Sequence, residues 1–193
     1  MIRLGILGST RGTNMLALIQ AIEDSILLAT IEIVISNKPN ALILERAKTS
    51  GLSAQYISPE GLNRSEYDKK ISDLLVKHHV DLVVLIGYMR ILSPDFVSFW
   101  SNKVINVHPS LLPAFAGKMD VQVHQAVLDV GMKETGCTIH YVTQHIDAGP
   151  IILQKKCRVS PDDTVESLKE KVQKLEGLAL VQSIQLIKVN GHL

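Results

Sequence analysis

The sequence has few aromatic residues, few cysteines and no excess of charge, and each shortage excludes a class of protein. Aromatic residues make up 4% of the 193 residues, and the only cysteines are Cys137 and Cys157. Two cysteines cannot form the disulfide framework of a small secreted domain, so both are expected to be buried free thiols. The 20 Lys and Arg against 19 Asp and Glu offer no bulk charge for nucleic acid or an anionic membrane.

Long apolar runs are absent as well. The first apolar stretch, residues 2–7, is too short for a secretory signal and is soon followed by Arg11. No segment is long enough to span a bilayer. We therefore expect a cytoplasmic protein with small-molecule partners. Its 46% of hydrophobic residues can fill the core of a single domain over residues 1–193.

Short β-branched runs alternate with helical patterns in the first half of the chain, which is typical of a βαβ fold. The run 82–86 is apolar at every position, as a parallel strand covered by helices on both faces must be. The pattern predicts an α/β fold with an open, doubly wound, mostly parallel sheet. The expected strands are 2–7, 31–36, 54–57, 82–86 and 104–107.

The second half has a different pattern. Ser93 and Pro94 are typical of a helix start, and that helix should reach about Trp100. A loop and a short helix near 123–130 precede two alternating strands, 135–142 and 151–159, which predict an antiparallel part of the sheet. A last helix, capped by Asp163 or Thr164, should run from 165 towards 189.

The loop after the first strand, Gly8 to Asn14, leads directly into a helix. Main-chain amides at such a helix start suit an anion above the strand ends. The loop has neither the spacing of a P-loop nor that of a dinucleotide site, and strand 31–36 ends without an acidic residue for a ribose diol. A single phosphate fits best, although the glycines could equally serve only a tight turn.

Asn106 and His108 stand at the end of the fifth predicted strand, where open α/β sheets bind ligands. Side chains two apart on a strand point the same way, so the two can share a pocket. A carboxamide and an imidazole suit the stabilisation of an oxyanion and proton transfer near neutral pH. An isolated histidine at a strand end is more often structural, so these residue types alone do not decide.

A set of motifs adds specificity, because together they resemble the signature of the folate-dependent formyltransferases over nearly the whole chain. They are Asn106-x-His108-Pro109-Ser110-Leu111-Leu112-Pro113, Phe115-x-Gly117, Gly136-Cys137-Thr138-Ile139-His140 and Asp147-x-Gly149-Pro150-Ile151.

The resemblance implies direct attack of a substrate amine on the formyl carbon of 10-formyltetrahydrofolate, through a tetrahedral intermediate. It points to glycinamide ribonucleotide of purine biosynthesis as the acceptor. Asn106 and a protonated His108 would hold the oxyanion, and Asp147 would favour the charged imidazole and relay a proton. It also implies a Rossmann-like fold with a phosphate-binding half, about 1–100, and a catalytic and folate half, about 101–193.

The resemblance also assigns two sets of binding residues. Glu176 lies near the apolar stripe of the last predicted helix, where an unpaired carboxylate would be costly. A helix-edge side chain that reaches solvent is the simpler interpretation. The ribotide set is Gly12, Thr13, Asn14, Met15, Leu16, Gln173 and Glu176. The folate set is Arg64, Met89, Arg90, Ile91, Leu92 and Asn106.

Some features depart from the family or leave alternatives. The loop 114–122 departs from the family pattern, because it lacks the proline that many relatives have before Gly117. Scattered histidines lack metal-ligand spacing, and no metal is expected; His140 is interpreted as a strand-face histidine. Monomer and homodimer stay open.

Three other functions share part of this pattern. A formyltetrahydrofolate hydrolase would need an N-terminal regulatory domain, for which a strand beginning at Ile2 leaves no room. A tRNA formyltransferase would need a further domain and basic surface. A non-catalytic phosphosugar-binding module would not need Asn106, His108 and Asp147 together.

Overall fold

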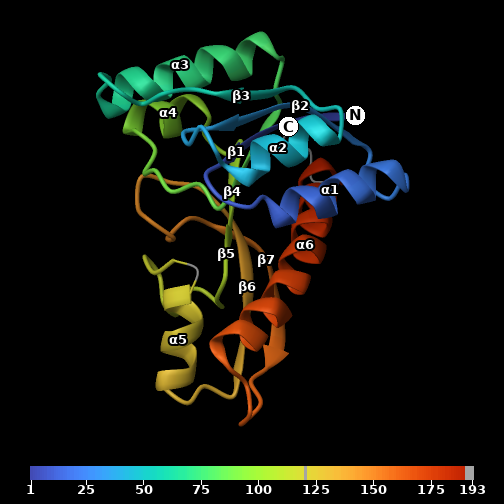
Figure 1. Ribbon diagram of the computed structural model, residues 1–193, viewed down its shortest axis with the longest axis vertical. Coiled ribbons are helices and arrows are strands. Elements are labelled where there is room, and N and C mark those ends of the chain that lie inside the picture. The colour runs from blue at the N-terminus through green and yellow to red at the C-terminus, as the bar shows by residue number, and fades with distance from the viewer. Residues whose placement is uncertain (120, 190–193) are drawn as a thin grey trace.

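The computed structural model describes residues 1–119 and 121–189, which fold around one seven-stranded sheet (Figure 1). Its strand order is β3-β2-β1-β4-β5-β6-β7. The first five strands are parallel, and β6 and β7 continue the sheet with antiparallel pairing. The expected α/β class is confirmed. The elements are β1 (Ile2–Gly8), α1 (Thr13–Glu23), β2 (Ala29–Ser36), α2 (Leu42–Thr49), β3 (Ala54–Tyr56), α3 (Arg64–Lys77), β4 (Leu82–Ile86), α4 (Pro94–Phe99), β5 (Val104–His108), α5 (Val121–Asp129), β6 (Glu134–Tyr141), β7 (Ile151–Arg158) and α6 (Val165–Val189).

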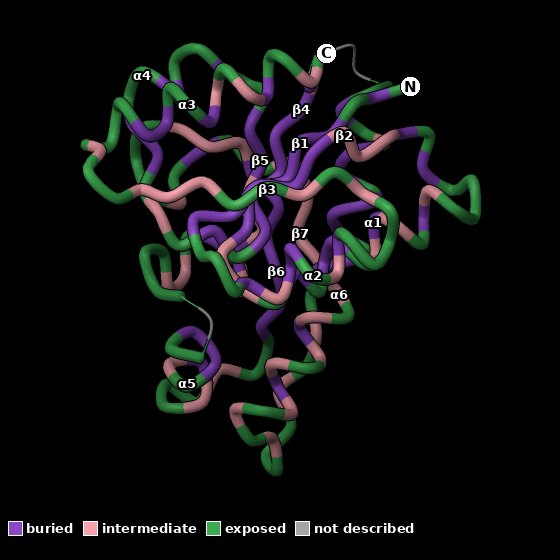
Figure 2. Tube along the Cα trace, turned by 45° about the horizontal axis from the view of Figure 1, so that its top comes forward, coloured by how far each residue is buried: buried purple, intermediate pink, exposed green. Residues whose placement is uncertain are grey.

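Helices cover both faces of the sheet. Leu4 and Ile6 of β1 pack in one apolar cluster with residues of α1, α2 and α6, whereas Leu7 packs in a second cluster with residues of α3 and α4. The central strands are therefore buried on both sides (Figure 2). This burial is why their sequences are apolar throughout rather than alternating.

Local capping fixes where several helices begin. Asn63 and Glu66 form a reciprocal capping box at the start of α3. The Ser93 hydroxyl accepts from the Phe96 amide at 3.2 Å, and Pro94 occupies the first turn of α4, as the sequence predicts. The signal at Ser93 and Pro94 is local, so the sequence alone was sufficient to predict the start of α4.

The order in which strands are added to the sheet reverses between β1 and β4, although these two strands are parallel. From β1 the chain builds the sheet outward through β2 and β3, and from β4 it builds the other way through β5. The loops after β1 and β4 meet there, since the Ser9 amide donates to the Gly87 carbonyl at 3.1 Å. Gly87 has φ +56°, and a Cβ on it would lie 2.3 Å from the Thr10 hydroxyl. Such a crossover leaves a crevice at the carboxyl ends of the strands.

Candidate active site

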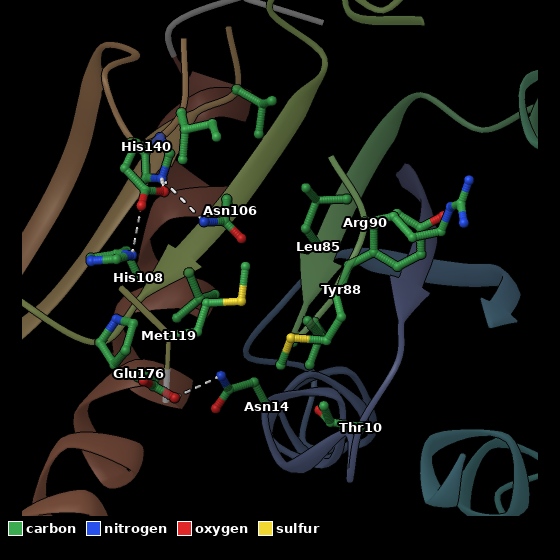
Figure 3. Close-up of a pocket in the computed structure, with 18 of the residues that line it drawn as sticks. Thr10, Asn14, Leu85, Tyr88, Arg90, Asn106, His108, Met119, His140 and Glu176 are labelled. Atoms are coloured by element: carbon green, nitrogen blue, oxygen red, sulfur yellow. Dashed lines mark hydrogen bonds and ion pairs between the residues drawn. The ribbon is translucent and has the colours of Figure 1, made fainter. Parts of the chain in front are cut away.

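One cavity of about 600 Å³ lies over the carboxyl ends of β1, β4 and β5. Its walls come from the loop after β1, the segment after β4, the loop between β6 and β7, and α6. Figure 3 shows the side chains of Asn106 and His108 on one side of this cavity and those of Asn14 and Glu176 below them. Segments from both halves of the chain therefore share one site.

The three predicted catalytic residues meet at this cavity. Asn106 and His108 leave β5 on the same side, as their spacing predicts, and both line the cavity. His108 is 4% exposed, and its Nδ1 lies 3.3 Å from Asp147 Oδ2. Asp147 comes from the loop between β6 and β7, so the pair joins residues that are distant in sequence.

Asp147 is held in place by main-chain geometry. It has φ +52°, and its Oδ2 also accepts from the Gly117 amide at 2.8 Å. The loop can return to β7 because Gly149 has no side chain: a Cβ there would lie 1.8 Å from the Tyr141 carbonyl oxygen. The glycine two residues after the aspartate therefore permits the approach of Asp147 to His108.

Burial governs the charge of His108. Desolvation lowers the pKa of His108, and the Asp147 carboxylate, which raises that pKa, does not reverse the net direction. Because Asp147 faces Nδ1 and a carboxylate accepts, the neutral imidazole carries its proton on Nδ1. Nε2 is buried and has no hydrogen-bond partner among the described residues. The protonated His108 that the resemblance implies is thus not the favoured form without a ligand.

His140 is a site residue that the sequence interpretation missed. It was expected only to lie on a strand face, but it lines the cavity and is 2% exposed. Antiparallel pairing puts it directly opposite Asn106, although the two are 34 residues apart. Only the register of β5 against β6 carries this information, and the periodicity of either strand does not.

The first loop and α6 form the other end of the cavity. Gly12, Thr13 and Asn14 line it, and the N-cap residue of α1, Gly12, has no side chain to cap the first turn. The Asn14 amide donates to Glu176 Oε2 at 2.9 Å, and Glu176 is 8% exposed. The simpler interpretation of Glu176 as a solvent-reaching helix-edge residue is therefore wrong. Gln173, one turn earlier, also lines the cavity.

Three residues of the predicted binding sets lie outside the cavity lining. Met15 is fully buried in the core. Leu16 faces a separate groove with Leu42 and Arg46 of α2. Successive residues of a helix point about 100° apart, so a first turn cannot direct five consecutive side chains to one ligand. Arg64 is the first residue of α3 and is exposed.

The segment Met89 to Leu92 lines the cavity, and contacts on its far side hold it in place. The Ser9 hydroxyl accepts from the Met89 amide at 2.9 Å and donates to Asn37 Oδ1 at 2.6 Å. The Arg90 guanidinium lies 4.3 Å above the Tyr67 ring. This wall is consequently attached to β1, β2 and α3.

The loop that departs from the family pattern borders the same cavity. Phe115 and Gly117 both have positive φ, and Lys118 and Met119 line the cavity. Residue 120, part of the loop 114–122, lies outside the described residues. Within the described ranges, no group of three His, Cys, Asp or Glu could hold a metal ion, and no helix is long and apolar enough to cross a bilayer.

The chain is similar to known proteins in sequence and in structure. It is 41% identical over 186 residues to a trifunctional purine biosynthetic protein adenosine-3 of Bos taurus, covering 96% of this chain and 18% of that protein. It is 37% identical over 175 residues to a phosphoribosylglycinamide formyltransferase of Haemophilus influenzae, covering 90% of this chain and 81% of the relative. The crystal structure of glycinamide ribonucleotide transformylase 1 from Symbiobacterium toebii superposes with a TM-score of 0.92 at 37% identity, covering 97% of this chain and 87% of that one.

The chain thus spans less than a fifth of the trifunctional relatives, but most of the bacterial one. The sequence pattern of the family described as formyl transferase matches residues 2–184. This match covers every strand and most of α6, and it includes Asn106, His108 and Asp147 of the cavity. The chain belongs to the formyl transferase family.

Proposed function

We propose that this protein transfers the formyl group of 10-formyltetrahydrofolate to the amine of glycinamide ribonucleotide. The observation that carries the proposal is the joining of two kinds of site in one cavity: Asn106, His108 and Asp147 at one end, and the start of α1 with Glu176 at the other. The amides of Gly12 to Asn14 suit the ribotide phosphate. Met89 to Leu92 would contact the folate.

The amine of the ribotide would attack the formyl carbon directly, so that the carbonyl oxygen becomes an oxyanion. Asn106 can donate an amide N–H to that oxygen. His108 can donate from Nε2 once it is protonated, and the oxyanion would raise the pKa of His108 in the same direction as Asp147 does. Ligand charge would then offset the burial that keeps the free imidazole neutral.

Collapse of the intermediate would break the bond between the formyl carbon and the folate nitrogen. The attacking amine loses one proton, and the departing nitrogen gains one. Asp147, beside His108 and 11% exposed in its side chain, would relay this proton. The main-chain amide of Gly117 on the same carboxylate oxygen would keep the carboxylate aimed at His108 during the relay.

The test follows absorbance as purified protein converts 10-formyltetrahydrofolate to tetrahydrofolate, with and without glycinamide ribonucleotide. We expect turnover only with the ribotide, and its loss in His108→Ala while ribotide binding persists. Turnover without the ribotide would replace the proposal with a hydrolase. A folded protein that binds the ribotide but neither binds folate nor turns over would be a phosphosugar-binding module instead.

A further inference from the structure

His140 and Asn106 form a directed contact across the β5–β6 pair. Asn106 Nδ2 lies 3.2 Å from His140 Nε2, and His140 Nδ1 lies 2.9 Å from the Tyr141 carbonyl oxygen. Figure 3 shows the Asn106 amide turned towards the His140 ring, with the His108 ring nearby. Both nitrogens of the buried imidazole are therefore in use.

The chemistry of the partners determines the tautomer. A carbonyl oxygen only accepts, so Nδ1 must carry the proton. Nε2 then holds the lone pair, and a carboxamide nitrogen is the group that can donate to it. The reversed amide would put the Asn106 oxygen against that lone pair. One orientation of the Asn106 amide is thus selected, with its second N–H available at the cavity.

We propose that His140 is a positioning residue, which as a neutral imidazole holds the donor side of the Asn106 amide in place for the formyl oxygen. This inference rests on the proposed function, because that reaction supplies the oxyanion. Without His140 the amide could rotate, and its oxygen would then repel the oxyanion that its nitrogen should stabilise.

The surroundings of His140 favour the neutral form. The titratable groups facing it are Asp147, whose Oδ1 lies 3.7 Å from Nε2, and His108 on β5. Burial lowers the pKa of His140, and the Tyr141 carbonyl and Asp147, which raise it, do not reverse that direction. A charged His140 would present an N–H to the Asn106 NH₂ group, and the contact would be lost.

The test combines a spectrum with a double-mutant cycle. The ¹⁵N spectrum of imidazole-labelled protein should show His140 protonated at Nδ1 only. His140→Leu should lower kcat about tenfold or more and change both KM values less than about twofold, since it removes a transition-state interaction. His140→Gln, whose side-chain oxygen can accept from Asn106, should restore most of the activity. In the Asn106→Ala background, His140→Leu should cost no more than about twofold further, because its partner is already absent.

His78→Leu, at the end of α3 and outside the cavity lining, is the matched control for loss of an imidazole. Melting temperatures show that each variant is folded. An Nε2-protonated His140, or a loss of kcat that is as large without Asn106 as with it, would overturn the inference. An inactive wild type would defeat the proposed reaction instead, and the ¹⁵N spectrum would still decide whether His140 accepts from Asn106.

Discussion

Replacing Asp147 with asparagine removes one charge at nearly constant size and tests how the carboxylate acts on His108. Two unit charges 3.3 Å apart interact by about 5 kcal/mol at an effective dielectric constant near 20. Partial solvent access reduces this, and an opposite charge at such a distance changes a pKa by roughly 1–3 units. Asp147 raises the pKa of His108, so Asp147→Asn must lower that pKa further.

The consequence for turnover follows from the protonated fraction. Above its pKa, His108 loses about tenfold of its charged form for each unit, so kcat at pH 7 should fall about 10- to 1000-fold. The decline of kcat with rising pH should begin at lower pH in the variant. An asparagine can also donate to His108 Nδ1, which would move the neutral proton to Nε2, where it could still donate to the oxyanion and offset part of the loss.

The assay is kcat against pH in steady state, with Asp73→Asn, an exposed partner of Lys69 on α3, as the matched control. The control should retain full activity. An unchanged kcat in Asp147→Asn would refute the reasoning altogether. A lower kcat with an unmoved pH profile would show that Asp147 relays the proton without adjusting the pKa of His108.

Three further predictions concern the scaffold. Gly149→Ala should lower the free energy of unfolding by about 3 kcal/mol or more, seen as a lower melting temperature, because its Cβ would overlap a main-chain carbonyl. Gly131 has φ +68° and open space around it, so Gly131→Ala should cost only about 1–2 kcal/mol. Ser9→Ala should raise the KM for the formyl donor more than that for the ribotide, because it removes the acceptor of the Met89 amide in the segment that we propose contacts the folate. The Lys171 ammonium helps to lower the pKa of Asp163 to about 2, so the stability from this carboxylate is present above about pH 4 and lost as pH falls towards 2; melting curves of Asp163→Asn should show a smaller acid-induced decrease.

Much of the fold could be predicted from the sequence because its signals are local. The strand 82–86 has the predicted bounds, and Val165–Val189 begins where the capping residues Asp163 and Thr164 indicated. The two cysteines are free, but only Cys137 is buried, whereas Cys157 is half-buried. The register puts Cys157 opposite Thr135 rather than opposite Cys137. Strand pairing of this kind is not encoded in the period of a single strand.

The candidate site was predictable to the extent that the family motif contains it. Asn106 and His108 follow from strand period and position, whereas Asp147 came from the resemblance and depends on a loop conformation that requires Gly149. His140 was missed because its place at the site depends on antiparallel register, and the motif did not predict the burial of the Met15 side chain because it gave a range without helical phase. Non-local pairing and helical phase are thus the features that the motif does not contain.

The balanced composition also conceals a local imbalance. The net charge of the chain is +1, so any recognition of an anion must come from where its charges are placed. The charged side chains of the described cavity lining comprise more cations than carboxylates: Arg11, Arg90, Lys118 and Lys169 against Asp147 and Glu176.

The two carboxylates in this lining each accept from an N–H group, Asp147 from Gly117 and Glu176 from Asn14. Because each is held by a donor, neither is simply a repulsive charge for an anionic ligand. The cations set the sign of the cavity, while the carboxylates define positions: one beside His108 at the reacting end, the other at the start of α1. A ligand phosphate can then bind the main-chain amides at the start of α1 rather than the Glu176 carboxylate, whose oxygen already accepts from Asn14. The acceptor that we propose, an amine-bearing phosphate ester, could place its phosphate at these amides and its amine near the carboxylate at the reacting end.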